Sequence, residues 1–223
     1  MEPLSEGSTQ RDHSGGSEGA CDLETRSRSC RVCRDAPIGR PLEREPRPIV
    51  ALSRTARIFI AGQAPGARAD QSGIPFSDPS GERLRDWMGI GPDVFYDRSR
   101  IAIVPMGFCF PGLDRHGGDR PPRRECRLTW HEEVFRSLGS VELLLMVGGH
   151  AQVWHARRAG ITLPEGRVGA AVAAWRNESF MQATPRLLPL PHPSWRNNAW
   201  LRRNTWFEAD LLPELRRLVA QLT

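Results

Sequence analysis

Residues 57–66 restrict the fold of this chain more than any other stretch. They read RIFIAGQAPG, so four largely apolar residues run directly into a turn of glycine and proline. A short apolar run with such an end is typical of a buried parallel strand. In open α/β sheets the ligand crevice lies at the carboxyl ends of the strands, where glycines let backbone N–H groups approach a bound group closely. We therefore expect a strand at 58–61 and a following turn that lines a binding site.

The alternation of strand and helix continues along the chain. Further strands are predicted at 101–105, 141–147 and 187–190. Helices are predicted from Ser80, as the N-cap, to Gly89, and also at 128–138, directly after 148–149, at 165–178 and at 206–222. This order is typical of a three-layer α/β/α sandwich around a short, mostly parallel central sheet, here of about four strands.

Length and composition indicate an ordinary globular protein. The 223 residues suffice for one domain with a full core. Residues 1–27 are rich in Ser, Gly, Glu and Arg and lack periodicity, which predicts a disordered tail before a single domain at 28–223. No apolar run approaches the roughly 18 residues of a membrane span, and the first residues lack the apolar core of a secretion signal. We expect a soluble, cytoplasmic monomer with no membrane partner.

Arginine carries all of the formal positive charge. The net charge is +5 and the sequence contains no lysine, so all 31 basic residues are arginines. Arginine is suited to bidentate contacts with phosphate groups. Together with seven tryptophans, this composition favours nucleic acid as the partner.

Four of the five cysteines form two spaced pairs. Cys30 and Cys33 form a C-x2-C motif, and Cys109 and Cys126 flank an irregular segment rich in glycine and proline. Four thiolates can complete either a tetrahedral zinc site or an iron–sulfur cubane. The alternative is four unconnected, buried thiols. The spacing alone does not choose between zinc and an iron–sulfur cluster.

Five motifs follow one another along roughly residues 28–220, and their order resembles that of a known protein family. They are Cys30/Cys33, the GQAPG at 62–66, the GIPF at 73–76, Cys109/Cys126 and the HPS at 192–194. In this order they resemble the uracil-DNA glycosylase superfamily, and most of all its iron–sulfur branch, often called family 4. The resemblance implies a 4Fe–4S cluster on the four cysteines, with zinc as the alternative.

The resemblance also implies an activity and a set of site residues. A member of this family hydrolyses the N-glycosidic bond of uracil or a related deaminated base in DNA, which starts base excision repair. The enzyme must hold the base outside the stack, stabilise the leaving anion and present water to the sugar. His192 would donate to the base oxygen that gains charge, and Phe76 would stack on the base. Gln63 and the backbone from Ala64 to Gly66 would line the pocket.

Two positions depart from the family pattern. Family 4 places a glutamate where Gln63 stands, and family 1 places an aspartate where Ala64 stands. A glutamine can position a water molecule but cannot deprotonate it. Asp78 is the first candidate to replace the missing acid and Asp70 the second, although a helix-terminal charge explains Asp78 equally well. The asparagine that reads uracil in relatives is also missing, since residues 104–108 read VPMGF.

The residues around His192 predict contacts with DNA. Arg196, Arg202 and Arg203 are candidates to meet phosphates, and Ser194 is a further candidate for a contact with DNA. Trp195 and Trp200 are candidates to fill the gap left by a flipped base. A second basic patch consists of Arg120, Arg123 and Arg124. A helix with a solvated basic face is the alternative explanation for the first set.

Three functions are consistent with these residues. The first is an iron–sulfur DNA glycosylase. The second is a catalytically weak or silent protein of the same fold that binds DNA or a damaged base, because the usual acid is absent. The third, and least favoured, is a zinc-containing nucleotide hydrolase that binds phosphate at the glycine-rich turn, but the chain lacks the lysine of a P-loop.

Overall fold

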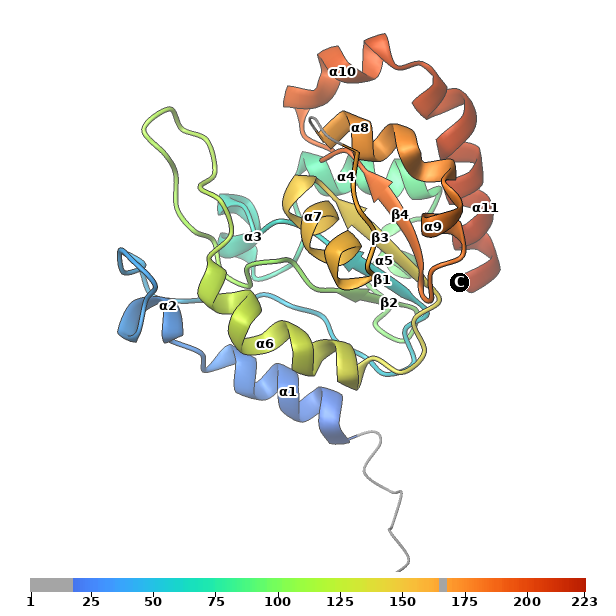
Figure 1. Cartoon of the computed structure of the whole chain (residues 1–223). Helices are drawn as coiled ribbons and strands as arrows, with labels where there is room; N and C mark the ends of the chain where they lie inside the picture. Colours follow the sequence, from blue (N-terminus) through green and yellow to red (C-terminus); the bar gives the residue numbers. More distant parts are fainter. Residues whose placement is uncertain (1–17, 165–167) are drawn as a thin grey trace, which may run out of the picture.

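A four-stranded parallel sheet forms the centre of the protein (Figure 1). The computed structural model describes residues 18–164 and 168–223. The strands are β1 (Ile58–Ala61), β2 (Ile101–Ile103), β3 (Leu143–Val147) and β4 (Arg186–Leu190). Their order across the sheet is β2-β1-β3-β4, and every neighbouring pair is parallel. The predicted parallel sheet is confirmed.

Helices surround this sheet on both faces. In chain order they are α1 (Glu18–Arg28), α2 (Val32–Asp35), α3 (Ala67–Ser72), α4 (Pro79–Met88), α5 (Pro92–Phe95), α6 (Arg124–Ser137), α7 (Gly149–Arg158), α8 (Val168–Ala173), η1 (Ala174–Arg176), α9 (Glu178–Met181), η2 (Trp195–Asn197), α10 (Asn198–Arg203), the π-helical turn η3 (Phe207–Leu211) and α11 (Leu212–Leu222). Among the described residues, no helix combines the length and the apolar character needed to cross a membrane.

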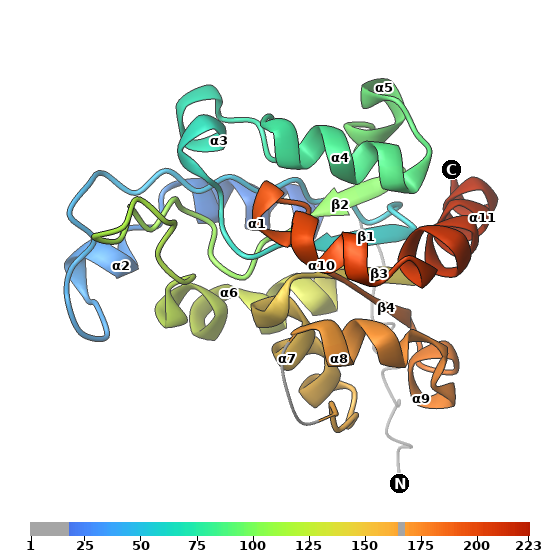
Figure 2. The same ribbon diagram turned by 90° about the horizontal axis from the view of Figure 1, so that it is seen from above.

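Alternate residues of the strands build two separate cores. In β1, Ile58 and Ile60 pack with side chains of α4, α5 and α11, whereas Phe59 and Ala61 pack with side chains of α1, α6 and α7. This alternation follows from the pleat, which points successive side chains to opposite faces of a sheet. Figure 2 shows the resulting three layers, with α4 and α5 on one side of the sheet and α6 and α7 on the other. The predicted α/β/α sandwich is therefore confirmed.

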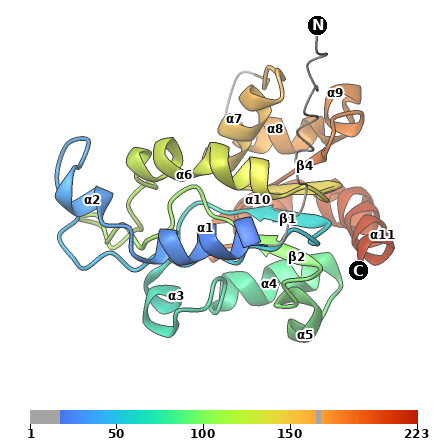
Figure 3. The same ribbon diagram turned by 90° about the horizontal axis from the view of Figure 1, so that it is seen from below.

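The N-terminal segment corrects one prediction. Residues 18–28 form α1, which lies beside α6 (Figure 3). Leu23 is buried, and the buried Glu24 carboxylate accepts hydrogen bonds from the Leu52 N–H (3.1 Å) and the Arg98 guanidinium (2.9 and 3.0 Å). The disordered tail predicted for 1–27 is thus wrong over residues 18–27, and residues 1–17 lie outside the described residues.

Several predicted helix boundaries also shift. The helix expected to be capped by Ser80 is capped by Asp78, whose Oδ1 accepts from the Gly81 N–H at 3.0 Å. The helix expected at 128–138 begins earlier, at Arg124. The helix expected at 165–178 comprises α8 and η1, and residues 165–167 lie outside the described part of the chain. The C-terminal helix opens with the π-helical turn η3 rather than with α-helix.

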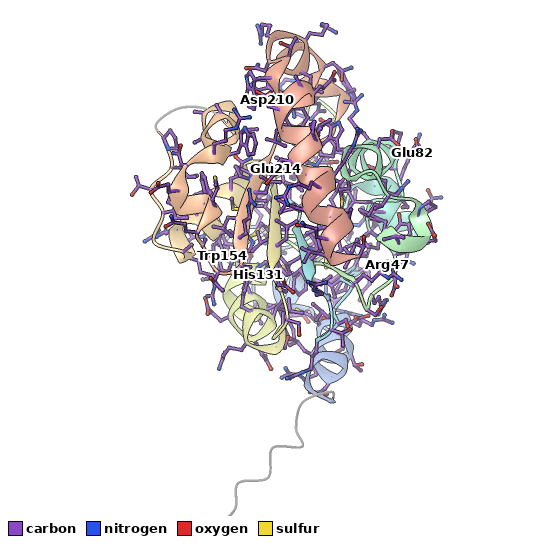
Figure 4. All side chains as sticks on the ribbon, turned by 90° about the vertical axis from the view of Figure 1, so that its right-hand side faces the viewer. Arg47, Glu82, His131, Trp154, Asp210 and Glu214 are labelled. Carbon is purple, nitrogen blue, oxygen red and sulfur yellow. The ribbon has the colours of Figure 1, made fainter. Side chains whose placement is uncertain are left out.

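Two histidines are buried between α6, α7 and the sheet. The His131 and Trp154 side chains, both labelled in Figure 4, lie with their ring centroids 5.1 Å apart, and the Trp154 ring lies 4.7 Å from that of His155. Burial lowers the pKa of His131 to about 4, against a slight opposing effect of the Pro105 and Met106 carbonyls. Burial likewise lowers the pKa of His155 well below its ordinary value of 6.5. Both imidazoles are therefore neutral in the folded protein at neutral pH.

This burial makes stability depend on pH in a defined direction. Between pH 6.5 and about 4 the unfolded chain binds a proton at His131 that the folded chain does not bind, so the free energy of unfolding falls as the pH falls. Each such histidine contributes about 1.4 kcal/mol per pH unit. We expect the His131→Phe variant, an aromatic replacement without a titrating group, to lose less stability between pH 6.5 and 5 than the wild type. Urea unfolding across this range measures the two slopes, and equal slopes would contradict the prediction.

Candidate active site

The turns after the parallel strands meet at one edge of the sheet. Backbone pairing continues past the strand ends, because the Met106 N–H donates to the Gly62 carbonyl (3.0 Å) and the Gly148 N–H donates to the Leu190 carbonyl (2.9 Å). A cavity of about 50 Å³ opens at this edge. Six of the residues predicted for catalysis or base binding line it: Gln63, Ala64, Gly66, Phe76, Asp78 and His192. The first turn of the sheet and the histidine from the far end of the chain thus share one cavity.

A wider groove of about 560 Å³ adjoins this cavity. Gln63, Asp78 and His192 line both spaces. The groove also contains the predicted DNA-contacting residues Ser194, Trp195 and Arg196. An extended ligand in the groove could therefore reach the cavity with one of its parts.

His192 is held by the segment that follows it. The Asn197 side-chain amide donates to the His192 carbonyl at 2.6 Å. Arg83 of α4 donates to the Ser194 carbonyl (3.2 Å) and to Asn198 Oδ1 (2.8 Å), which fastens this segment to α4. Burial lowers the pKa of His192, and the Asp78 carboxylate offsets part of this shift. A neutral imidazole with one N–H donor is the result at neutral pH.

Phe76 adopts a backbone conformation that is rare outside glycine, with φ at +53°. Its carbonyl accepts hydrogen bonds from the Tyr96 hydroxyl (3.1 Å) and from Arg85 (3.4 Å). Its ring lies against Gly62, where an added Cβ would stand only 3.2 Å from the ring. Residues in such strained conformations occur often in ligand clamps. The surrounding contacts therefore fix the orientation of this ring beside the cavity.

Gln63 packs against the turn that follows β3. Gly148 has φ at +85°, and a Cβ on it would lie only 2.5 Å from the Gln63 side-chain nitrogen. Glycine is thus required at position 148 both for its backbone and for the close approach of the amide. Because an amide cannot accept a proton under these conditions, Gln63 can orient a ligand or water but cannot act as a base.

The two candidate aspartates lie in different surroundings. Asp78 lines the cavity, and its Oδ1 accepts from the Ser80 hydroxyl (2.6 Å) and the Gly81 N–H (3.0 Å). Asp70 is buried in an ion pair with Arg44 and does not line the cavity. Asp70 is therefore not placed to replace the missing acid, whereas Asp78 is.

A known protein family matches most of the sequence. The family model of the uracil DNA glycosylase superfamily matches residues 50–216. The chain belongs to the uracil DNA glycosylase superfamily. Among solved structures, it is similar to the solution NMR structure of a "putative Uracil DNA glycosylase from Methanosarcina acetivorans", with 15% identity and a TM-score of 0.42, over 76% of this chain and 94% of that one.

The tryptophans of this superfamily member differ in their surroundings. Trp195 is 73% exposed, and the Arg196 guanidinium lies 5.9 Å from the centre of its ring. Trp200 is instead half-buried and packs against Gly169, Trp206 and Phe207. It lines neither the cavity nor the groove, and its role as a wedge in DNA stays a prediction. Arg202 and Arg203 are exposed on α10 and line neither the cavity nor the groove.

In the second predicted basic patch, one of the three arginines is held by contacts within the protein. Arg123 donates to the Arg40 carbonyl and pairs with Glu125, so its guanidinium has a structural role. Arg120 lies 3.9 Å from Glu43, and Arg124 is exposed. These two arginines border a hollow beside the loop between Cys109 and Cys126.

The paired cysteines lie near one another, but not in ligating geometry. The Trp130 indole N–H points to Cys30 Sγ (3.3 Å) and the Phe108 N–H points to Cys126 Sγ (3.1 Å). Burial raises the pKa of the Cys109 thiol to about 12, and the nearby Cys33 and Cys30 add to this shift. Within residues 18–164 and 168–223, no three histidine, cysteine, aspartate or glutamate side chains come close enough together to hold a metal ion.

Asp119 is the one acidic residue of the cavity that the sequence analysis did not single out. It lines both the cavity and the groove and comes from the irregular loop between Cys109 and Cys126. Burial raises the pKa of its carboxyl, Arg196 opposes this shift, and the negative charges of Asp78 and Asp114 add to it. No motif marks this residue, because only the fold brings residue 119 next to the turn at 62–66.

Proposed function

We propose that this protein is a DNA glycosylase that hydrolyses the N-glycosidic bond of uracil or a related deaminated base in DNA, and that it belongs to the iron–sulfur, family 4-like branch of its superfamily. One observation carries the activity: His192, Phe76 and the glycine-rich turn after β1 line a single cavity. The adjoining groove, with Trp195 and Arg196, supports DNA as the substrate.

The site residues match the demands of the reaction. As the bond between the sugar and the base breaks, positive charge develops on the sugar and negative charge on the base. The neutral His192 imidazole donates a hydrogen bond to the base oxygen that gains charge, and such a donor in a cavity shielded from water stabilises a transition state effectively. The fixed Phe76 ring stacks on the flipped base, and Asp78 places its negative charge near the sugar.

The groove residues supply the contacts that base flipping needs. An exposed aromatic side chain can enter the gap in the stack or stack on a neighbouring base, and Trp195 is the large exposed aromatic of the groove. Arg196 beside it, with Arg203 on α10, is suited to phosphate contacts. The Ser194 hydroxyl is a further candidate for such a contact.

We propose Cys30, Cys33, Cys109 and Cys126 as ligands of a 4Fe–4S cluster, with zinc as the alternative. Support comes from the chemistry of the donor set and from the N–H groups that point to two of the sulfurs, because hydrogen bonds to sulfur are typical of cluster sites. Such a cluster, when bound, crosslinks the N-terminal segment to the loop that follows β2.

The alternative function, a protein that binds damaged DNA without efficient catalysis, follows from one feature of the site. Neither Gln63 nor Ala64 can act as a base, so the position used by relatives contributes no carboxylate. This protein would bind a uracil-containing strand in the same groove and would release base slowly or not at all.

Base release from defined oligonucleotides tests the activity. We expect the wild type, prepared without oxygen, to form abasic sites in at least one of four substrates containing uracil, hypoxanthine, xanthine or hydroxymethyluracil. Tight binding of such an oligonucleotide without base release would favour the alternative function. Neither binding nor base release would exclude both.

Elemental analysis tests the cluster independently of activity. We expect iron, acid-labile sulfide and absorption near 400 nm in the wild type and in Cys21→Ser, and their loss in Cys126→Ser. Zinc without iron would exclude the iron–sulfur cluster, and an unchanged metal content in Cys126→Ser would exclude these ligands.

A further inference from the structure

We propose that Asp119 is a catalytic residue of this site and that it acts with Asp78 on a water molecule beside Gly66. The inference rests on the proposed glycosylase function and supplies the base that the turn at 62–66 lacks. It assigns the task to a residue far from that turn in sequence, on the loop between β2 and α6.

The loop has the order that a catalytic residue requires. It projects from the body of the molecule in Figure 1 and folds back on itself as a hairpin, in which Leu113 and Asp119 form an antiparallel bridge. The Asp114 N–H donates to the Gly118 carbonyl (2.7 Å), and Asp114 Oδ1 accepts from the Gly118 N–H (2.8 Å). Arg196 packs against Gly118, within 3.2 Å of where a Cβ would stand. The hairpin thus holds Asp119 in the lining of the groove that also contains His192.

An open space separates the two carboxylates. The position that a Cβ on Gly66 would occupy lies 3.6 Å from Asp119 Oδ2 and 3.8 Å from Asp78 Oδ2. Glycine leaves this position empty, and the cavity of about 50 Å³ has room for more than one water molecule. A water there would have two acceptor oxygens beside it.

The two carboxylates are suited to different tasks. Asp78 Oδ1 already accepts two hydrogen bonds from the start of α4, so this group is fixed in place and only its Oδ2 is directed to the space beside Gly66. Burial raises the pKa of the Asp119 carboxyl, Arg196 opposes this shift and the charge of Asp78 adds to it, so Asp119 is a stronger base than an ordinary aspartate. Asp78 therefore orients the water, and Asp119 receives its proton.

In the hydrolytic step one bond forms at C1′ of the sugar and one bond breaks there. The water oxygen bonds to C1′ of the sugar, and the bond from C1′ to the base nitrogen breaks with its electron pair left on the base. The proton of the water passes to the Asp119 carboxylate. The base leaves as an anion that accepts a hydrogen bond from His192 and takes up a proton from solvent. No cofactor or further reactant is needed.

Two variants test this assignment in the full-length protein. Asp119→Asn keeps the shape of the side chain but cannot take a proton, and we expect single-turnover base release to slow by at least about 10-fold. Gly66→Ala places a methyl group in the water position, and its backbone (φ −79°, ψ 175°) is one that alanine adopts without strain. We expect a comparable loss of rate from Gly66→Ala.

Binding and pH dependence distinguish catalysis from a structural role. We expect Asp119→Asn to bind an uncleavable 2′-fluorouridine oligonucleotide as the wild type does. In the wild type the rate should fall as the pH drops through the raised pKa of Asp119, and this part of the profile should be absent from Asp119→Asn. The charged and titratable groups that face Asp119 are Asp78, Asp114, Arg196 and His192. The matched control is Asp93→Asn, an exposed aspartate of α5 that lines neither the cavity nor the groove, and it should keep the wild-type rate and profile.

Each contrary result has a defined meaning. An Asp119→Asn rate within twofold of the wild type would overturn the proposal, and so would a loss of rate matched by an equal loss of binding. Wild-type protein that releases no base from any of the substrates would overturn the proposed function and, with it, this assignment. An active wild type with an unaffected Asp119→Asn variant would overturn the assignment alone.

Discussion

Replacing His192 by alanine is expected to slow base release by about 10²–10³-fold, the loss typical when one donor to a developing anion is removed. The imidazole lines the cavity, and burial lowers its pKa so that it remains neutral at neutral pH. Its N–H donor gains strength only as charge moves onto the base, so the loss should appear in the rate constant of the chemical step. Single-turnover kinetics on the preferred substrate measure it.

His150→Ala is the matched control for this prediction. His150 is an exposed histidine on α7 that lines neither the cavity nor the groove. It should release base at the wild-type rate. A His192→Ala rate within threefold of the wild type would show that another group stabilises the leaving base.

Replacing Gly81 by alanine is expected to cost about 3 kcal/mol of the free energy of unfolding, because its Cβ would overlap well-packed backbone. That Cβ would stand only 1.8 Å from the Phe76 carbonyl oxygen, which the Tyr96 hydroxyl and Arg85 also hold. Relief requires the Phe76 backbone to move, so base release should also fall. Urea unfolding measures the first effect and single-turnover kinetics the second.

Gly139→Ala is the control for this substitution. Gly139 is exposed, and no atom lies within 4 Å of the position its Cβ would take. Its stability should stay within about 0.5 kcal/mol of the wild type. If Gly81→Ala is too unstable to purify, Tyr96→Phe removes one hydrogen bond from the same carbonyl and should cost about 0.5–1.5 kcal/mol. If Gly81→Ala and Tyr96→Phe were both as stable as the wild type, the claim that neighbouring residues hold Phe76 in a strained conformation would be contradicted.

The sheet could be predicted because its signal is local. All residues of β1 are buried, since helices cover both faces of a parallel sheet, and the strand therefore appears in the sequence as an unbroken apolar run. Helix α1 could not be predicted in the same way. Its one deeply buried apolar residue in the described segment is Leu23, and its buried Glu24 attaches it to Arg98 and to the Leu52 N–H. Charged contacts of this kind leave no hydrophobic period in the sequence.

The candidate site was predictable where a motif marks it and not elsewhere. His192 and Phe76 stand in short motifs, and the fold brings both to the cavity. Trp195 and Trp200 are alike in sequence, and only packing against α8 and η3 distinguishes the half-buried Trp200 from the exposed Trp195. Asp119 lies in an irregular loop whose path back to Gly66 is set by hairpin contacts.

Helix α4 connects three parts of the site, so a change in this helix affects all three. Its N-cap is Asp78, its Gly81 lies under the Phe76 carbonyl, and its Arg83 fastens the segment after His192. A small tilt of this one helix would displace the carboxylate, the aromatic ring and the histidine loop in concert. A substitution beneath α4, as at its contact with α11, should therefore alter binding and chemistry jointly, and a second change on the same helix should restore both.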